Sequence, residues 1–114
     1  MRVLAVEHPS FMLHEQQRWH PERPDRLIAA RAGLVSAPVE IVGAEALPVS
    51  LDLLRTLHTA DYVTAIEAFC AAGGGDLDSD TYAVAESWEA AIRSAGAGPI
   101  AVDRLNEGAA EVAF

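Results

Sequence analysis

The sequence predicts an α/β, helix-rich fold. Residues 3–6 (VLAV) form a continuous apolar run that is typical of a buried strand, and residues 39–42 (VEIV) are expected to form a second short strand. A helical pattern at residues 25–35 lies between them. A strand, a helix and a second strand in this order form the beginning of a β-α-β unit, in which the strands pair in parallel. Residues 111–114 are apolar enough to begin a third strand.

The connection between the first strand and the first helix has no clean period from residue 7 to residue 24. A structureless connection of that length inside a small domain is usually functional or disordered. Disorder is disfavoured by its large apolar side chains, which are Phe11, Met12, Leu13 and Trp19.

Two prolines precede the helix expected at residues 25–35. Pro24 suits the threshold of a helix, because its fixed φ is compatible with the first turn, and Asp25 is expected to cap the helix. The residues expected to face inward are Leu27, Ile28, Ala30 and Leu34.

Two shorter helices are expected in the middle of the chain. Ser50 is expected to cap one that runs to about Leu57, and Asp61 to cap one that runs to about Ala72. The second is expected to bury Tyr62, Ile66 and Phe69. The glycine triplet at residues 73–75 predicts a mobile linker after it, because glycine leaves the backbone unrestricted.

A long helix is expected from about residue 83 or 86 to Leu105. Pro99 lies inside it and lacks a backbone N–H, which predicts a kink or a break.

The composition predicts a single small domain, since 114 residues with 51% hydrophobic content can bury a modest core. The net charge of −9, with arginine as the only basic residue type, disfavours binding to nucleic acid or to an anionic membrane. Cys70 is the only cysteine, so neither a disulfide framework nor a cysteine metal site is expected. Glu7 ends the N-terminal apolar run before a signal-peptide core, and a cytoplasmic protein is expected.

The four histidines, His8, His14, His20 and His58, do not predict a metal site. No two ligands stand at i, i+4 on a helix, and zinc needs three or four ligands that converge. Isolated packing or surface histidines are the favoured interpretation, and for His58 a hydrogen-bonded structural role.

The acidic segment Asp76-x-Asp78-x-Asp80 is similar to the start of a calcium-binding loop. Thr81 stands where such a loop requires glycine, and Ser87 stands where it requires a bidentate acid. The pattern alone therefore favours a solvated acidic loop before the following helix.

Four segments in this order resemble the zinc-dependent histone deacetylase family, above all its bacterial class II-like members and the acetylpolyamine amidohydrolases. They are residues 20–27 (HPERPDRL), 57–63 (LHTADYV), 76–82 (DLDSDTY) and 87–91 (SWEAA). The resemblance implies an arginase/deacetylase α/β fold with a parallel sheet flanked by helices. Residues 1–114 are then the N-terminal segment of a single deacetylase domain, which supplies the first strands and their covering helices.

The resemblance also implies roles for particular residues. Asp80 matches an aspartate at the pocket rim that accepts hydrogen bonds from substrate backbone amides, with Asp78 as the alternative. Arg26 matches an arginine that lines an internal cavity below the zinc; the other interpretation is a surface arginine in the first turn, where a cation is unfavourable. The candidates for one wall of the acyl-lysine tunnel are Phe11, Met12, Leu13 and His14, although each is also suited to filling the core.

In the family, a zinc ion held by two aspartates and a histidine activates water, and a histidine pair transfers protons. Residues 111–114 match the entry to the strand that leads to that pair, so we expect these 114 residues to lack the zinc ligands and to be inactive alone. In the intact enzyme the expected substrates are acetyl-lysine peptides or acetylpolyamines. Alone, the chain is expected to self-associate through an exposed sheet edge. The alternative is a stand-alone, non-catalytic binding or regulatory module, or a gene remnant.

Overall fold

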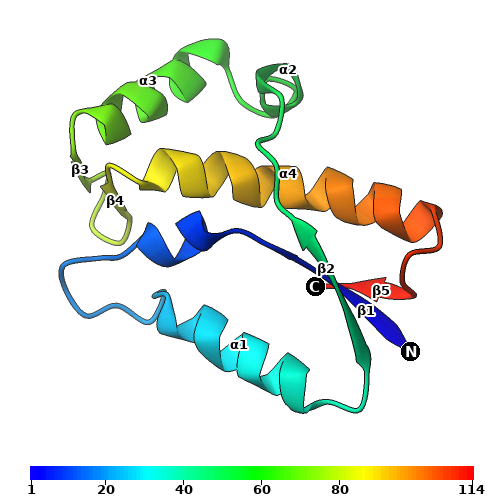
Figure 1. Ribbon diagram of the computed structural model, residues 1–114. Helices are drawn as coiled ribbons and strands as arrows, with labels where there is room; N and C mark the ends of the chain where they lie inside the picture. Colours follow the sequence, from blue (N-terminus) through cyan, green and yellow to red (C-terminus); the bar gives the residue numbers. More distant parts are fainter.

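A three-stranded parallel sheet lies at the centre of the computed structural model, which describes all 114 residues. Its strands are β1 (Arg2–Glu7), β2 (Glu40–Glu45) and β5 (Val112–Ala113), in the order β2-β1-β5 (Figure 1). Val3 of the central strand pairs with both neighbours, and residues 3–6 are all buried. The three predicted strands and their parallel pairing are therefore confirmed.

One face of the sheet is covered by α4 (Ser87–Asn106), which packs on a small core. The core residues are Leu4, Val6, Ala46 and Ala110, and the helix residues against them are Ala97, Ile100, Ala101 and Leu105. Of the two outcomes predicted at Pro99, the break is wrong, because α4 is one helix of 20 residues (Figure 1), and the kink stays a prediction. The missing N–H leaves the Ala95 carbonyl unpaired within the helix, but Ala95 is exposed and water can bond to it.

The opposite face of the sheet carries α1 (Asp25–Ser36), whose Leu34 and Val35 line a small cavity together with Ala5 and Ile41. No residue of α1 is fully buried. The inward orientation predicted for Leu27 and Ile28 is wrong, since both are exposed, whereas Ala30 and Leu34 are half-buried. The physical reason is that α1 meets the sheet through its C-terminal half, which leaves the first turns without a packing partner.

The helix α1 also begins differently from the prediction. Pro24 already has helical dihedral angles and occupies the N-cap position, and no side chain caps the helix. Asp25 is therefore the first helical residue rather than the cap. Its carboxylate lies 3.3 Å from Arg23 and still interacts favourably with the positive end of the helix dipole.

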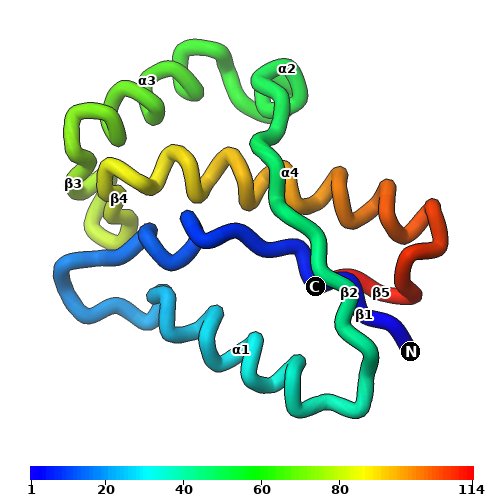
Figure 2. Tube along the Cα trace, in the orientation of Figure 1, coloured from blue at the N-terminus to red at the C-terminus, as the bar shows by residue number.

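Two helices, α2 (Leu51–Leu54) and α3 (Ala60–Ala71), pack outside α4 (Figure 2). Ser50 caps α2 as predicted, accepting a hydrogen bond from Leu53 N at 3.2 Å, but the helix is shorter than expected. The predicted cap of α3 is wrong: Thr59 Oγ1 accepts from the backbone of the third helical residue at 3.3 Å, and this places Asp61 in the first turn.

The starting point of α3 decides which of its residues are buried. Val63 and Cys70 are buried and Ile66 and Phe69 are half-buried, whereas Tyr62 is 54% exposed. The predicted burial of Tyr62 is wrong because the face toward α4 passes through positions 63, 66 and 70, and position 62 is turned away from it by one helical step.

The predicted glycine linker is instead a β-hairpin. Strand β3 (Gly74–Asp76) pairs antiparallel with β4 (Tyr82–Val84). Gly74 has φ +76°, and a Cβ there would lie 2.2 Å from the Ala83 carbonyl oxygen. The glycine thus permits close pairing of the two strands instead of mobility.

Crossing a membrane takes a helix of greater length and apolar character than any in this fold. The outer strands β2 and β5 leave Ile41 and Val112 partly exposed. Self-association through this sheet remains a prediction.

Candidate functional site

The loop after β1 starts at the edge of the sheet where parallel strands present their carboxyl ends. It opens with a short 3-10 helix, η1 (Pro9–Leu13), which packs against α4. His8 caps this helix, because its Nδ1 accepts a hydrogen bond from Ser10 N at 3.1 Å. The His8 Nε2 atom lies 3.9 Å from Glu45 at the carboxyl end of β2. Ligands of open α/β sheets usually bind at this edge.

The four wall candidates occupy different environments. Phe11 is half-buried and packs against the core, and its ring meets the His8 ring edge to face at a centroid distance of 6.4 Å. Met12 and Leu13 are exposed. His14 Nδ1 lies 2.7 Å from the Ser87 hydroxyl, which ties the loop to the first turn of α4. The tunnel-wall role of these residues remains a prediction.

Asp80 lies in the turn between β3 and β4, with 88% of its side chain exposed. Its neighbour Asp78 is engaged within the turn: one oxygen accepts from Asp80 N at 2.8 Å and the other from Thr81 Oγ1 at 3.0 Å. These bonds, chiefly the one from Asp80 N, hold the pKa of Asp78 below its usual value. Asp78 therefore orders the turn while it is ionised, and this order is lost as pH falls through the lowered pKa.

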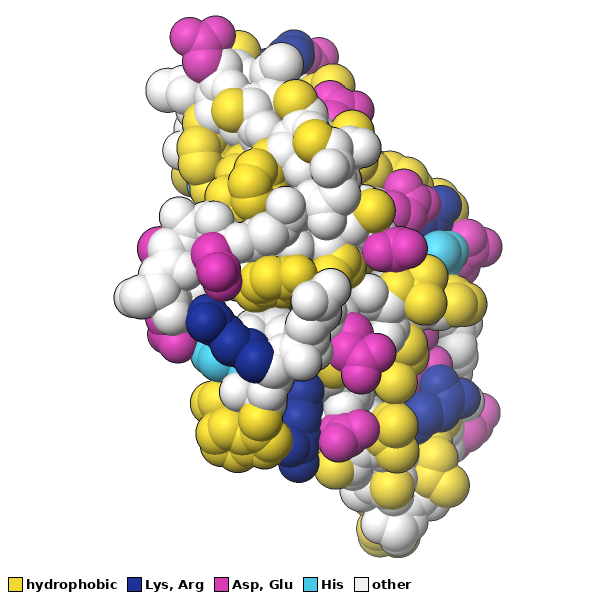
Figure 3. All heavy atoms as spheres, turned by 90° about the vertical axis from the view of Figure 1, so that its left-hand side faces the viewer, with side chains coloured by type: hydrophobic (Ala, Val, Ile, Leu, Met, Phe, Trp, Pro, Cys, Tyr) yellow, Lys and Arg dark blue, Asp and Glu magenta, His cyan; other side chains and the backbone are white.

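Three contacts join the hairpin to the loop after η1, across about sixty positions of sequence. His20 Nε2 lies 2.9 Å from Asp80 Oδ1. Arg18 Nη2 donates to the Ser79 carbonyl oxygen at 3.2 Å and lies 3.2 Å from Asp76. Figure 3 views the molecule from this side and shows arginine, histidine and acidic side chains close together among apolar ones.

Neither Arg18 nor the pairing of His20 was identified from the sequence. The sequence predicts only an isolated packing or surface histidine at position 20, within the motif at residues 20–27. The available signal is its proline-rich neighbourhood, which holds the backbone extended and in a fixed direction.

Arg26 lies on the surface of the first turn of α1, with 59% of its side chain exposed. It forms an ion pair with Glu22, four residues earlier. The cavity role implied by the family remains a prediction.

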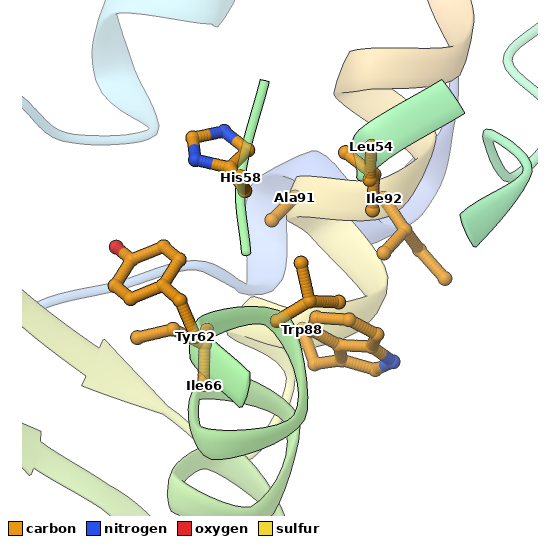
Figure 4. Close-up of a pocket in the computed structure, with 8 residues that line it drawn as sticks. Leu54, His58, Tyr62, Ile66, Trp88, Ala91 and Ile92 are labelled. Atoms are coloured by element: carbon orange, nitrogen blue, oxygen red, sulfur yellow. The ribbon is translucent and has the colours of Figure 1, made fainter. Parts of the chain in front are cut away.

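The remaining histidine, His58, belongs to a separate apolar cavity of about 200 Å³ between α2, α3 and α4 (Figure 4). Its ring packs against Tyr62 at a centroid distance of 5.5 Å, and both rings lie at the edge of the cavity. The predicted hydrogen-bonded role of His58 is wrong: it is exposed and its ring makes no hydrogen bond, because the neighbouring side chains are apolar or aromatic. The other lining residues are Leu54, Val63, Ile66, Trp88, Ala91 and Ile92.

Comparison with known proteins supports the resemblance. The model of the family described as "Histone deacetylase domain" matches residues 20–114. A protein of Methanothermobacter thermautotrophicus named "Probable deacetylase" is 30% identical over 101 residues, which are 89% of this chain and 30% of that protein. "Histone deacetylase 15" of Arabidopsis thaliana is 35% identical over 92 residues, covering 78% of this chain and 16% of that protein.

A solved structure gives the same result for the fold. The crystal structure of the HDA15 HD domain superimposes on 98% of this chain with a TM-score of 0.83 at 28% identity. The match covers 34% of that domain's chain. The chain thus spans about a third or less of the length of the relatives it matches.

Proposed function

Because this chain belongs to the histone deacetylase family, we propose that it supplies the substrate rim and part of the tunnel wall of a zinc-dependent deacetylase. The reaction is hydrolysis of the amide bond in acetyl-lysine or a related acetylated amine. The two curated relatives are named as deacetylases, and the fold matches a deacetylase domain. The bacterial class II-like and acetylpolyamine assignments are part of the same proposal.

One observation supports the rim assignment most directly: Asp80 presents a carboxylate to solvent beside a loop that starts at the carboxyl ends of the strands. Its Oδ1 contacts His20, and its Oδ2 makes no hydrogen bond or ion pair within the chain. An ionised carboxylate oxygen accepts hydrogen bonds from amide N–H groups, and such charge-assisted bonds are stronger than neutral ones. Asp80 is therefore suited to bind the backbone of an extended acetylated peptide.

Asp78 is less suited to that role, although the sequence leaves it as the alternative. Both of its oxygens already accept hydrogen bonds within the turn. A substrate amide would have to compete with Asp80 N and the Thr81 hydroxyl for the same oxygens.

Zinc does not fit the donor set of these 114 residues. No group of three or more His, Cys, Asp or Glu side chains is arranged to hold a metal ion. His8, His14 and His20 are already engaged with Ser10, Ser87 and Asp80. Within the proposal, these residues therefore bind and orient the substrate and hold no catalytic metal.

The proposed activity is tested in a protein that carries these residues within a complete deacetylase domain. We expect acetate release from an acetyl-lysine peptide, from an acetylated polyamine, or from both, and loss of activity after zinc is removed with a chelator. Absence of acetate release from both substrates would favour the non-catalytic binding module.

The 114-residue chain alone is expected to retain no stoichiometric zinc and to hydrolyse no acetyl-lysine peptide. Metal content after dialysis and turnover of a fluorogenic acetylated peptide measure this. The control is the same chain unfolded in urea, because isolated histidines bind zinc weakly whether or not the chain is folded. One tightly held zinc per folded chain, together with turnover, contradicts the expectation.

Arg26→Ala in the complete domain is expected to lower kcat about tenfold, equivalent to about 1.4 kcal/mol, and to change KM little. The reason is that a guanidinium lining the internal cavity would act on a step that follows substrate binding. The matched control is Glu22→Gln, which removes the ion pair but keeps Arg26. An exposed ion pair is worth about 1 kcal/mol or less, so equal activity of both variants assigns Arg26 to the surface.

A further inference from the structure

The tautomer of a neutral His20 ring follows from its contacts with Glu22 and Asp80. The Glu22 backbone N–H lies 3.0 Å from Nδ1 and can only donate, so Nδ1 is the acceptor nitrogen of the ring. The Glu22 carbonyl oxygen is farther from the same nitrogen, at 3.4 Å. A neutral imidazole with an unprotonated Nδ1 carries its proton on Nε2. The His20 Nε2–H therefore donates to Asp80 Oδ1 at 2.9 Å.

The two partners differ in freedom of movement. The His20 side chain is 15% exposed, and its ring is fixed by the Glu22 backbone, whereas the Asp80 side chain is 88% exposed. An exposed aspartate samples several rotamers unless a bond selects one. The His20 bond is the side-chain contact that selects one for Asp80, and it leaves Oδ2 open.

A second bond holds the backbone of the same turn. Arg18, two positions before His20, donates to the Ser79 carbonyl oxygen, one position before Asp80. The loop after η1 thus fixes both the main chain and the carboxylate of the turn. The Arg18 bond keeps the turn in place when the His20 bond is removed, so the two effects are separable.

We propose that His20 is a positioning residue for substrate binding. Its Nε2–H holds Asp80 Oδ1 so that Oδ2 is directed to the backbone amides of an acetylated peptide. This inference rests on the proposed rim function of Asp80 and assigns His20 no contact with the reacting atoms. It predicts that the rim recognises peptides well only when the loop after η1 and the hairpin turn are in contact.

The test compares three variants of the complete deacetylase domain. His20→Gln places an amide N–H close to the position of Nε2, whereas His20→Asn places it close to Nδ1, too short to reach Asp80. We expect His20→Asn and His20→Ala to lower kcat/KM about three- to tenfold on an acetylated peptide, mostly through KM. The loss is smaller than that for Asp80→Ala because the Asp80 carboxylate is still present and only its position is less well fixed. His20→Gln is expected to retain most of the activity, and the losses of all three variants are expected to be much smaller on a small acetylated amine, as for Asp80→Ala.

A spectroscopic measurement checks the bond itself. Nitrogen-15 NMR of the histidine rings distinguishes the two neutral tautomers, and His20 is expected in the Nε2–H form. Asp80→Asn is expected to shift the His20 ring signals while leaving those of His8 in place. A His20 ring in the Nδ1–H form overturns the proposal, as does equal peptide activity of His20→Gln and His20→Asn.

The two hypotheses fail in different ways. If Asp80→Ala leaves peptide hydrolysis unchanged, the rim function fails, and with it the positioning role, whatever the tautomer. If Asp80→Ala impairs hydrolysis but His20→Asn does not, the rim function stands and the positioning role of His20 is wrong.

Discussion

Asp80→Ala is expected to lower kcat/KM about ten- to a hundredfold on an acetylated peptide substrate. A carboxylate that accepts hydrogen bonds from substrate amides contributes about 1.5 to 3 kcal/mol, which corresponds to that range. The loss is expected to be much smaller on a small acetylated amine, which has no backbone amides to offer. Steady-state kinetics of the complete deacetylase domain on both substrates measure the difference.

The neighbouring aspartates provide the controls. Asp76→Ala removes an exposed ion pair with Arg18 and is expected to change activity little. Asp78→Ala removes two bonds that order the turn and is expected to give an intermediate loss. If Asp80→Ala keeps kcat/KM within about twofold on a peptide, too little for a lost charge-assisted bond, the rim assignment is wrong and Asp78 becomes the candidate.

The elements that the sequence predicts well are those determined by local composition. The run at residues 3–6 is apolar on both faces, and the structure buries it between α4 and α1. Ser50 is a strong cap residue at the start of a leucine-rich helical pattern and does cap α2. Such local patterns predict structure without information about distant residues, because the residues that carry the pattern also form the strand or helix end that it predicts.

The elements that the sequence predicts wrongly are those whose structure depends on residues far away in the sequence. The glycines at 73–75 indicate flexibility by themselves, and only pairing with β4 turns this segment into a strand. Pro99 indicates a break by itself, and the packing of Ile100 on the sheet keeps the helix continuous. Tertiary contacts override local propensity in both places.

In the candidate site, too, some features are predicted from local sequence and others depend on distant residues. Asp80 was identified because its motif is similar to that of the family, and nothing in its own spacing separates it from Asp78. The structure separates them through the hydrogen bonds inside the turn. The contact between His20 and Asp80, and the tautomer that it requires, depend on the relative orientation of two loops. No pattern in the sequence encodes that orientation.

Gly96→Ala is expected to destabilise the fold by about 3 kcal/mol, at the upper end of the cost of overpacking. Gly96 is buried in α4 where the segment after β2 crosses the helix, and Val49 N donates to the Ile92 carbonyl oxygen at 2.9 Å. A Cβ at position 96 would lie 1.9 Å from the Leu47 carbonyl oxygen and 2.9 Å from Val49 N. Both obstacles are backbone atoms, so relief requires a shift of the whole segment.

Gly33→Ala in α1 is the matched control for a helical glycine. A Cβ at position 33 meets nothing within 4 Å, so the substitution is expected to stabilise the protein by about 0.5–1 kcal/mol, because alanine loses less backbone entropy on folding. Urea unfolding of both variants measures the difference, and thiol labelling of Cys70 provides a second reading. Cys70 is buried and burial raises the pKa of its thiol, against a hydrogen bond from the Trp88 backbone, so labelling reports opening of the fold. If Gly96→Ala unfolds at the same urea concentration as Gly33→Ala, the close packing of residues 47–49 on α4 at Gly96 is wrong.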